Sequence, residues 1–151
     1  MSQPSPMITD EQLSAEGLEL RNHGQVLLIA CGALAREILA LTKANGWTHM
    51  DLQCLPAILH NAPEKITPAV KAMIERSRAK YAEIFVAYAD CGTGGQLQRL
   101  CDDMGVSMIA GPHCYSFFEG NAGFEAREEL TCFYLTDFLV RQFDAFFWRP
   151  M

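Results

Sequence analysis

The chain has 151 residues, half of them hydrophobic and a fifth charged, which is typical of a globular domain with a core of its own. Its formal net charge of −6 at pH 7 excludes the strongly basic surface on which nucleic-acid binding depends, so no nucleic-acid partner is expected. No apolar run is long enough to cross a bilayer, and the first residues lack the layout of a signal peptide. We therefore expect a cytoplasmic protein without a membrane partner.

Residues 1–23 are polar and only weakly periodic, which predicts a flexible N-terminal arm with at most one short helix. A single α/β domain is expected over residues 24–151. Five segments in this region have the length and character of strands, at 26–30, 49–55, 83–88, 106–110 and 132–135. Segments of helical period separate them, which is the pattern of a parallel sheet with crossover helices.

This alternation predicts a Rossmann-like, three-layer domain with a mainly parallel sheet of about five strands. The expected strand order is 2-1-3-4-5, with the first strand buried on both faces because it is a continuous apolar run. The second strand alternates Asp51 and Gln53 with apolar neighbours, which predicts an edge strand.

The last expected helix begins near Thr136 and Asp137, and its aromatic side chains run almost to the end of the chain. An apolar face at this place has two interpretations. Either it packs on a second copy in a homodimer, or the domain is truncated at its C-terminus.

Four of the six cysteines end or follow a predicted strand, and His113 adjoins one of them. The carboxyl ends of parallel strands meet at one edge of a sheet, where ligands bind. Thiolate and imidazole donors select zinc, iron or an iron–sulfur cluster. We therefore predict a metal site at this edge, with candidate ligands Cys31, Cys54, Cys91, Cys114 and His113.

The spacing of these cysteines leaves a plainer interpretation open. None of the four belongs to a local C-x-x-C pair, so the metal hypothesis depends on topology alone. Free cysteines are often buried as small apolar side chains, and we interpret Cys101 and Cys132 in that way.

The segment from Asp90 to Gly95 is a glycine-rich turn between a strand and a helix. Backbone amides of Gly92, Thr93, Gly94 and Gly95 are candidates to bind an anionic group of a cofactor, although a tight turn alone would also explain the glycines. The P-loop lysine and spacing are absent, so nucleotide hydrolysis is not expected.

Two histidines and one acid near the same edge are candidates for proton transfer. Imidazole is both a common metal ligand and the usual proton shuttle near pH 7. A loop histidine bonded only to backbone is the alternative. The candidate catalytic residues are His60, His113 and Asp90.

Four segments, taken in chain order, resemble the prokaryotic domain-of-unknown-function family numbered sixteen thirty-eight: Ala30-Cys31-Gly32-Ala33-Leu34-Ala35-Arg36-Glu37, Cys54-Leu55-Pro56-Ala57 with Leu59-His60-Asn61, Asp90-Cys91-Gly92-Thr93-Gly94-Gly95 and Gly111-Pro112-His113-Cys114-Tyr115. The resemblance runs from about residue 25 to residue 148. It implies no established activity. Genes of this family often lie beside those of corrinoid-dependent methyltransferases, so the resemblance implies a corrinoid protein or a methyltransferase as partner. Family members usually continue past the last helix, which agrees with the expected truncation.

Three hypotheses for function follow. The first is a metal-binding accessory protein or enzyme of corrinoid-linked one-carbon methyl transfer, in which zinc would hold a thiol substrate as thiolate, or an iron–sulfur cluster would pass electrons to a corrinoid. The second is a metal-free enzyme with Cys91 or Cys31 as nucleophile, His113 as base and the amides of the glycine-rich turn as anion hole. The third is a non-catalytic module that binds a cofactor or a partner.

Overall fold

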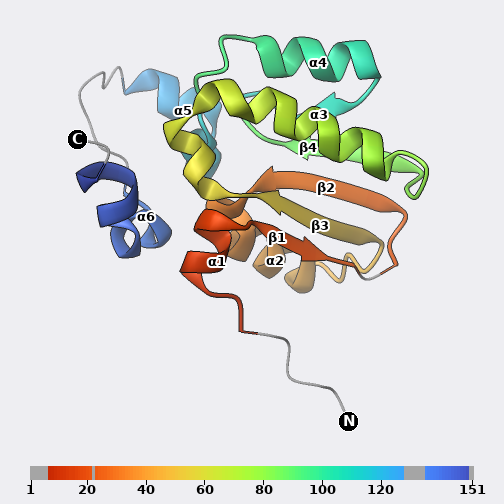
Figure 1. Cartoon of the computed structure of the whole chain (residues 1–151), viewed down its shortest axis with the longest axis horizontal. Helices are drawn as coiled ribbons and strands as arrows, with labels where there is room; N and C mark the ends of the chain where they lie inside the picture. Colours follow the sequence, from red (N-terminus) through yellow and green to blue (C-terminus); the bar gives the residue numbers. More distant parts are fainter. Residues whose placement is uncertain (1–6, 22, 128–134, 150–151) are drawn as a thin grey trace.

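The structure is a computed structural model that describes residues 7–21, 23–127 and 135–149 (Figure 1). The strands are β1 (Leu18–Leu20), β2 (Val26–Cys31), β3 (Met50–Leu55), β4 (Glu83–Ala87) and β5 (Ser107–Met108). The α-helices are α1 (Asp10–Ala15), α2 (Ala35–Ala44), α3 (Ile66–Ser77), α4 (Gln96–Met104), α5 (Asn121–Ala126) and α6 (Asp137–Arg141). Short 3-10 turns are η1 (Gly32–Leu34), η2 (Ala57–Asn61), η3 (Pro63–Lys65) and η4 (Cys114–Phe118), and a π-helical turn, η5 (Asp144–Trp148), follows α6.

The five strands form one sheet in the order β1-β3-β2-β4-β5. The pairs β2–β3, β2–β4 and β4–β5 are parallel, and only β1–β3 is antiparallel. The prediction of an α/β fold with a mainly parallel sheet is therefore confirmed, and four of its strands have the predicted order. The strand predicted at 132–135 lies almost entirely outside the described residues.

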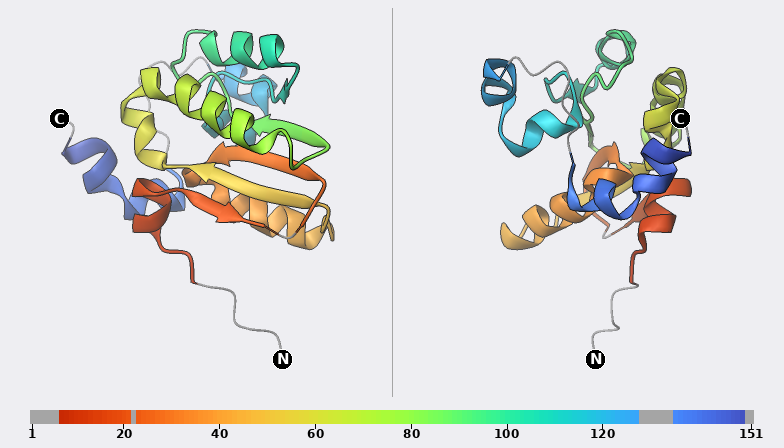
Figure 2. Two further views of the ribbon diagram at one scale, coloured as in Figure 1. Left: turned by 45° about the vertical axis from the view of Figure 1, so that its right-hand side comes forward. Right: turned by 90° about the vertical axis from the view of Figure 1, so that its left-hand side faces the viewer.

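The interior strands are apolar because helices cover the sheet on both sides. Figure 2 shows α1 and α3 on one side and α2 on the other. In β2, Leu27 and Ile29 are completely buried, and Val86 of β4 is equally buried beside them. Buried side chains of α3, such as Val70 and Ile74, complete this part of the core.

The edge predicted for the second strand was wrong. Strand β1 pairs with β3, with Leu18 opposite Cys54 and Leu20 opposite Leu52. Asp51 and Gln53 of β3 are nevertheless buried. The carboxylate of Asp51 accepts hydrogen bonds from the Tyr81 hydroxyl and from the amide of Gly24, which offset the cost of burying it. Polar and apolar alternation in β3 therefore does not mark a solvent-facing side.

The N-terminal segment contains the one short helix that the sequence allowed, followed by a strand. Helix α1 begins with the Thr9 side chain accepting a hydrogen bond from the amide of Gln12, and its Leu13 is completely buried. Gly17, at φ +82°, then turns the chain into β1, and any Cβ at this position would collide with the carbonyl of Cys54. A six-residue helix and a three-residue strand are too short to give a periodic sequence signal.

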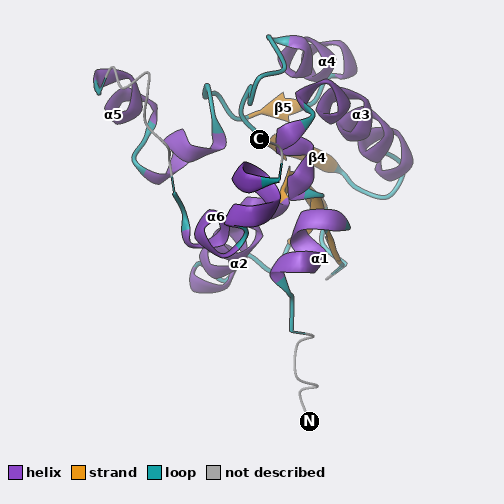
Figure 3. Cartoon of the chain, turned by 60° about the vertical axis from the view of Figure 1, so that its left-hand side comes forward, coloured by secondary structure: helices purple, strands orange, loops and turns teal. Residues whose placement is uncertain are grey.

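The C-terminal segment folds back on the body of the chain, and Figure 3 shows α6 beside α1 and α2. Thr136 caps α6, as expected, by accepting a hydrogen bond from the amide of Leu139. Phe138, Leu139 and Phe146 are buried, whereas Phe143 and Trp148 are exposed. In the described part of the chain, no helix combines the length and the apolar character needed to cross a membrane.

Candidate functional site

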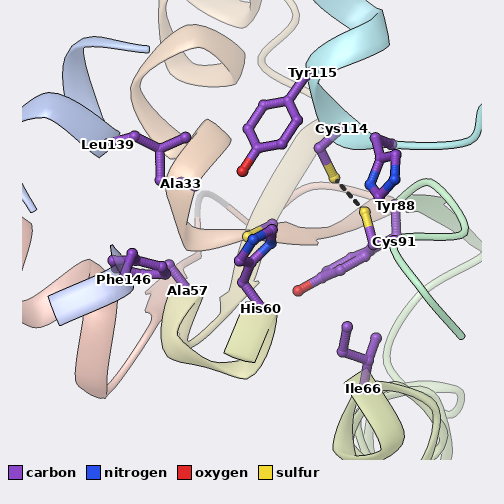
Figure 4. Close-up of a pocket in the computed structure, with 12 residues that line it drawn as sticks. Ala33, Ala57, His60, Ile66, Tyr88, Cys91, Cys114, Tyr115, Leu139 and Phe146 are labelled. Atoms are coloured by element: carbon purple, nitrogen blue, oxygen red, sulfur yellow. Dashed lines mark hydrogen bonds between the residues drawn. The ribbon is translucent and has the colours of Figure 1, made fainter. Parts of the chain in front are cut away.

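A small cavity lies where β2 and β4 end, at the carboxyl edge of the sheet (Figure 4). Its volume is about 30 Å³. Three cysteines and two histidines from four separate segments line it, together with two tyrosines and an apolar wall: Cys31, Cys91, Cys114, His60, His113, Tyr88, Tyr115, Ala33, Ala57, Ile66, Leu139 and Phe146. The topology therefore brings together five of the residues that the sequence singled out.

Cys91 and Cys114 are in contact in the cavity, with 3.2 Å between their sulfur atoms (Figure 4). The loop after β4 and the loop after β5 run side by side here, because the amides of Asp90 and Cys91 donate hydrogen bonds to the carbonyls of Gly111 and Pro112. Cys91 has a left-handed backbone, with φ 48°, and is half-buried, whereas Cys114 is buried. The first sulfur is thus the more accessible of the two.

The two sulfurs differ in charge as well as in exposure. A hydrogen bond from the Cys114 thiol and the neighbouring His113 together lower the pKa of Cys91 to about 5, although burial opposes them. The same contact raises the pKa of Cys114. Contact with Cys91 raises the pKa of His113. At neutral pH Cys91 is therefore a thiolate, held between a neutral thiol and an imidazole.

The pKa values of the two histidines shift in opposite directions, upward for His113 and downward for His60. Burial lowers the pKa of His60, so this imidazole is neutral at pH 7. Its ring lies 6.1 Å from that of Tyr115 and 6.2 Å from that of Phe146, and both His60 and Tyr115 project into the cavity (Figure 4). The Nδ1 atom of His113 is buried, and no described residue forms a hydrogen bond with it. Each ring thus offers a nitrogen to a ligand.

The other two predicted ligands, Cys31 and Cys54, point to opposite faces of the sheet because of their register. Cys31 ends β2 and lines the cavity, where burial raises its pKa to about 11 against the effect of the Tyr88 hydroxyl. Cys54 is paired with Ala30, one position before Cys31, so its side chain lies on the opposite face of the sheet. It is buried there, and burial raises its pKa. The predicted four-cysteine set is therefore reduced to three cysteines.

Asp90 organises the glycine-rich turn rather than facing the cavity. Its carboxylate accepts hydrogen bonds from the Thr93 hydroxyl at 2.9 Å, from the Gly95 amide at 2.7 Å and from the Gly94 amide at 3.3 Å. Burial alone would raise the pKa of Asp90, but these bonds and one from Gly92 lower it. Of the amides predicted to bind an anion, those of Gly92, Gly94 and Gly95 are thus bonded to this carboxylate, and that of Thr93 donates to the Asp90 carbonyl.

The sequence did not single out Tyr88 and Tyr115 as site residues. Tyr88 is almost completely buried with its hydroxyl beside Cys31, and Tyr115 follows Cys114 directly. A signal for Tyr115 was present in its position next to a predicted ligand. Tyr88 looked like the end of an apolar strand, so nothing distinguished it from a core residue.

The donors converge without forming a finished coordination sphere. As the side chains stand in the described residues, no three of the types His, Cys, Asp and Glu are arranged to hold a metal ion. Any ion at this place would therefore have to draw the thiols and an imidazole inward by rotation of their side chains.

Comparison with known proteins gives one finding. The family described as "Protein of unknown function (DUF1638)" matches residues 54–151. This range includes His60, Cys91, His113 and Cys114 but not Cys31. Neither the curated proteins nor the solved structures contain a match.

Proposed function

Since this chain belongs to the DUF1638 family of proteins of unknown function, we propose from its geometry that it binds a single zinc or iron ion at the carboxyl edge of the sheet. The proposed ligands are Cys31, Cys91 and Cys114 with one imidazole, from His60 or His113. One observation carries this proposal: three thiols and two imidazoles from distant segments line the same small cavity. Soft sulfur and nitrogen donors in this number suit zinc or iron.

The spacing of the two neighbouring sulfur atoms suits a single ion. Tetrahedral zinc with bonds of about 2.3 Å sets two sulfur ligands about 3.8 Å apart. Cys91 and Cys114, at 3.2 Å, would have to separate by only about half an ångström.

The charges of the residues also suit this role. Cys91 supplies a thiolate without further deprotonation, and His60 is neutral, as a metal ligand must be. Ala57, Leu139 and Phe146 form an apolar wall on one side of the site. If only three of these four side chains bind the ion, the fourth position would stay open for a small thiol, held as thiolate.

The setting that we propose is corrinoid-linked one-carbon methyl transfer, with this chain as an accessory protein or as the enzyme that methylates a thiol. A corrinoid protein or a methyltransferase would be the partner. The proposal for this setting depends on the gene neighbourhood that family membership implies. We also propose a Rossmann-like, three-layer arrangement, which is supported by helices on both sides of the sheet, and a cytoplasmic location, which would keep the thiols reduced.

A second candidate function is supported by the low pKa of Cys91. A half-buried thiolate beside an imidazole has the chemistry of a metal-free nucleophile with His113 as base. The anion hole that such an enzyme requires has less support, because Asp90 occupies the amides of Gly94 and Gly95.

The test is the metal and acid-labile sulfide content of the whole chain, purified without oxygen and without a metal-binding tag. We expect about one zinc or iron per chain and no sulfide. Cys91→Ala should lose most of the metal, because it removes the thiolate at the centre of the donor set. Cys101→Ala is the matched control, since Cys101 is buried in α4 and does not line the cavity. Metal-free wild type, or equal metal in both variants, would refute the proposal.

A further inference from the structure

We infer that Cys91 and Cys114 form a reversible dithiol–disulfide pair that exchanges with low-molecular-weight disulfides. This activity goes beyond the proposed metal site, although it uses two of the same sulfurs. It requires no metal, so it stands or falls separately from the proposed function.

The two sulfurs are close enough for a disulfide bond to form after a small movement. They lie 3.2 Å apart, and a disulfide bond is about 2.0 Å long, so the atoms have to approach by only about 1 Å. The backbones that carry them are fixed to each other by the hydrogen bonds from Asp90 to Gly111 and from Cys91 to Pro112. Oxidation would therefore need side-chain rotation rather than rearrangement of the sheet.

Exposure gives the two cysteines different roles. Cys91 is half-buried and precedes the exposed Gly92, so an incoming disulfide can reach its sulfur. Cys114 is only 8% exposed and lies behind Cys91. Cys91 is thus the attacking sulfur and Cys114 the resolving sulfur. Cys31 is buried as well, and its sulfur contacts the Tyr88 hydroxyl.

The chemistry balances with glutathione disulfide as the oxidant. The Cys91 thiolate attacks one sulfur of the oxidant, which forms a mixed disulfide and releases one glutathione thiolate. The Cys114 thiol loses its proton and attacks the Cys91 sulfur, which forms the intramolecular disulfide and releases the second glutathione thiolate. The protein dithiol loses two electrons, and the oxidant gains both.

Formation of this disulfide would remove two of the three thiols that we propose as metal ligands. Oxidised protein would therefore bind metal less tightly than reduced protein. Conversely, a bound ion would protect both sulfurs from exchange.

The experiment uses the full chain, stripped of metal by a chelator and equilibrated in buffers of reduced and oxidised glutathione. Free thiols are counted after acid quenching and alkylation, and the linked peptides are identified by mass spectrometry. We expect the loss of two of the six thiols and a Cys91–Cys114 disulfide. Cys114→Ser should instead accumulate a mixed disulfide of Cys91 with glutathione, and Cys101→Ser should behave like wild type.

Two results would overturn the inference. One is wild type in which other cysteines oxidise before this pair, and the other is Cys114→Ser that forms the mixed disulfide at a cysteine other than Cys91. The wild-type peptide map needs no variant, so misfolding of a variant cannot decide the outcome. A disulfide in a protein that never binds metal would refute only the proposed function, and metal binding without the disulfide would refute only this inference.

Discussion

At the scale of single residues, Cys91 combines two unusual properties. Its backbone is left-handed although it carries a side chain, a conformation that costs about 1 kcal/mol or more and is found most often at functional sites. This backbone sets the sulfur of Cys91 against that of Cys114 at the end of β4. The conformation and the low pKa thus have a common origin, because the contact that lowers the pKa depends on the turn.

The first prediction concerns the titration of Cys91 in metal-free protein. The thiolate persists as the pH falls until its pKa of about 5, so alkylation of Cys91 by iodoacetamide should have its midpoint there. Cys114→Ala removes the hydrogen bond to the thiolate. It should move the midpoint upward, toward the ordinary thiol value of 9.0. Alkylation rates at a series of pH values, with peptide mapping of the modified residue, measure this shift.

Cys101→Ala provides the control for this titration, because Cys101 lies in α4 and its own pKa is raised to about 11. Its removal should leave the midpoint of Cys91 unchanged. A wild-type midpoint close to that of an ordinary thiol would show that Cys114 and His113 do not stabilise the thiolate.

At the scale of elements, sequence patterns predicted those features that repeat over many residues. The residues of β2 form a continuous apolar run because helices cover both faces of the sheet. The sequence alone therefore predicted a strand here. Strand β1 has three residues and gave no pattern, and the polar Asp51 in β3 is bonded to Tyr81, thirty positions away. The carboxyl-edge argument found Cys31 and Cys91. It could not reject Cys54, because the side to which Cys54 points depends on where β3 begins.

The second prediction tests how α6 closes the cavity. Leu139 lines the cavity and is 2% exposed, whereas Val140, its neighbour in the same helix, is 57% exposed. Leu139→Ala should lower the free energy of unfolding by about 3 kcal/mol, since it leaves a void among apolar side chains. Val140→Ala should change it by less than about 0.5 kcal/mol. Urea unfolding of the two variants measures both values, and equal effects would mean that α6 does not pack as described.

At the scale of the whole molecule, helix α1 near the N-terminus and helix α6 near the C-terminus contact each other beside the cavity. The carboxylate of Asp10 in α1 binds both Arg36 of α2 and Arg141 of α6. The hydroxyl of Ser14 also donates a hydrogen bond to the side chain of Gln142, at 3.1 Å. The short N-terminal helix α1 is therefore held against α6, whose Leu139 lines the site.

The third prediction concerns the charge of Asp10, which contacts both Arg36 and Arg141. Burial tends to raise the pKa of Asp10, but its hydrogen bonds with Arg141 and Arg36 outweigh that effect and lower the pKa below its ordinary 3.8. A carboxyl group with a lowered pKa stabilises the fold fully above its unfolded value, and the contribution is lost as the pH falls through the folded value. Wild type should thus be more stable than Asp10→Asn by about 1 kcal/mol near neutral pH.

This difference should be constant from neutral pH down to about one unit above 3.8 and should shrink below it, because the protonated Asp10 resembles the amide. Urea unfolding of both proteins across this range measures it. Glu19→Gln is the control, since Glu19 pairs with Arg21 only two positions away, and both side chains are about half exposed. A stability difference that did not change with pH would place the effect of Asp10→Asn in packing rather than in charge, and the two arginines would then contribute little to holding α6 against the site.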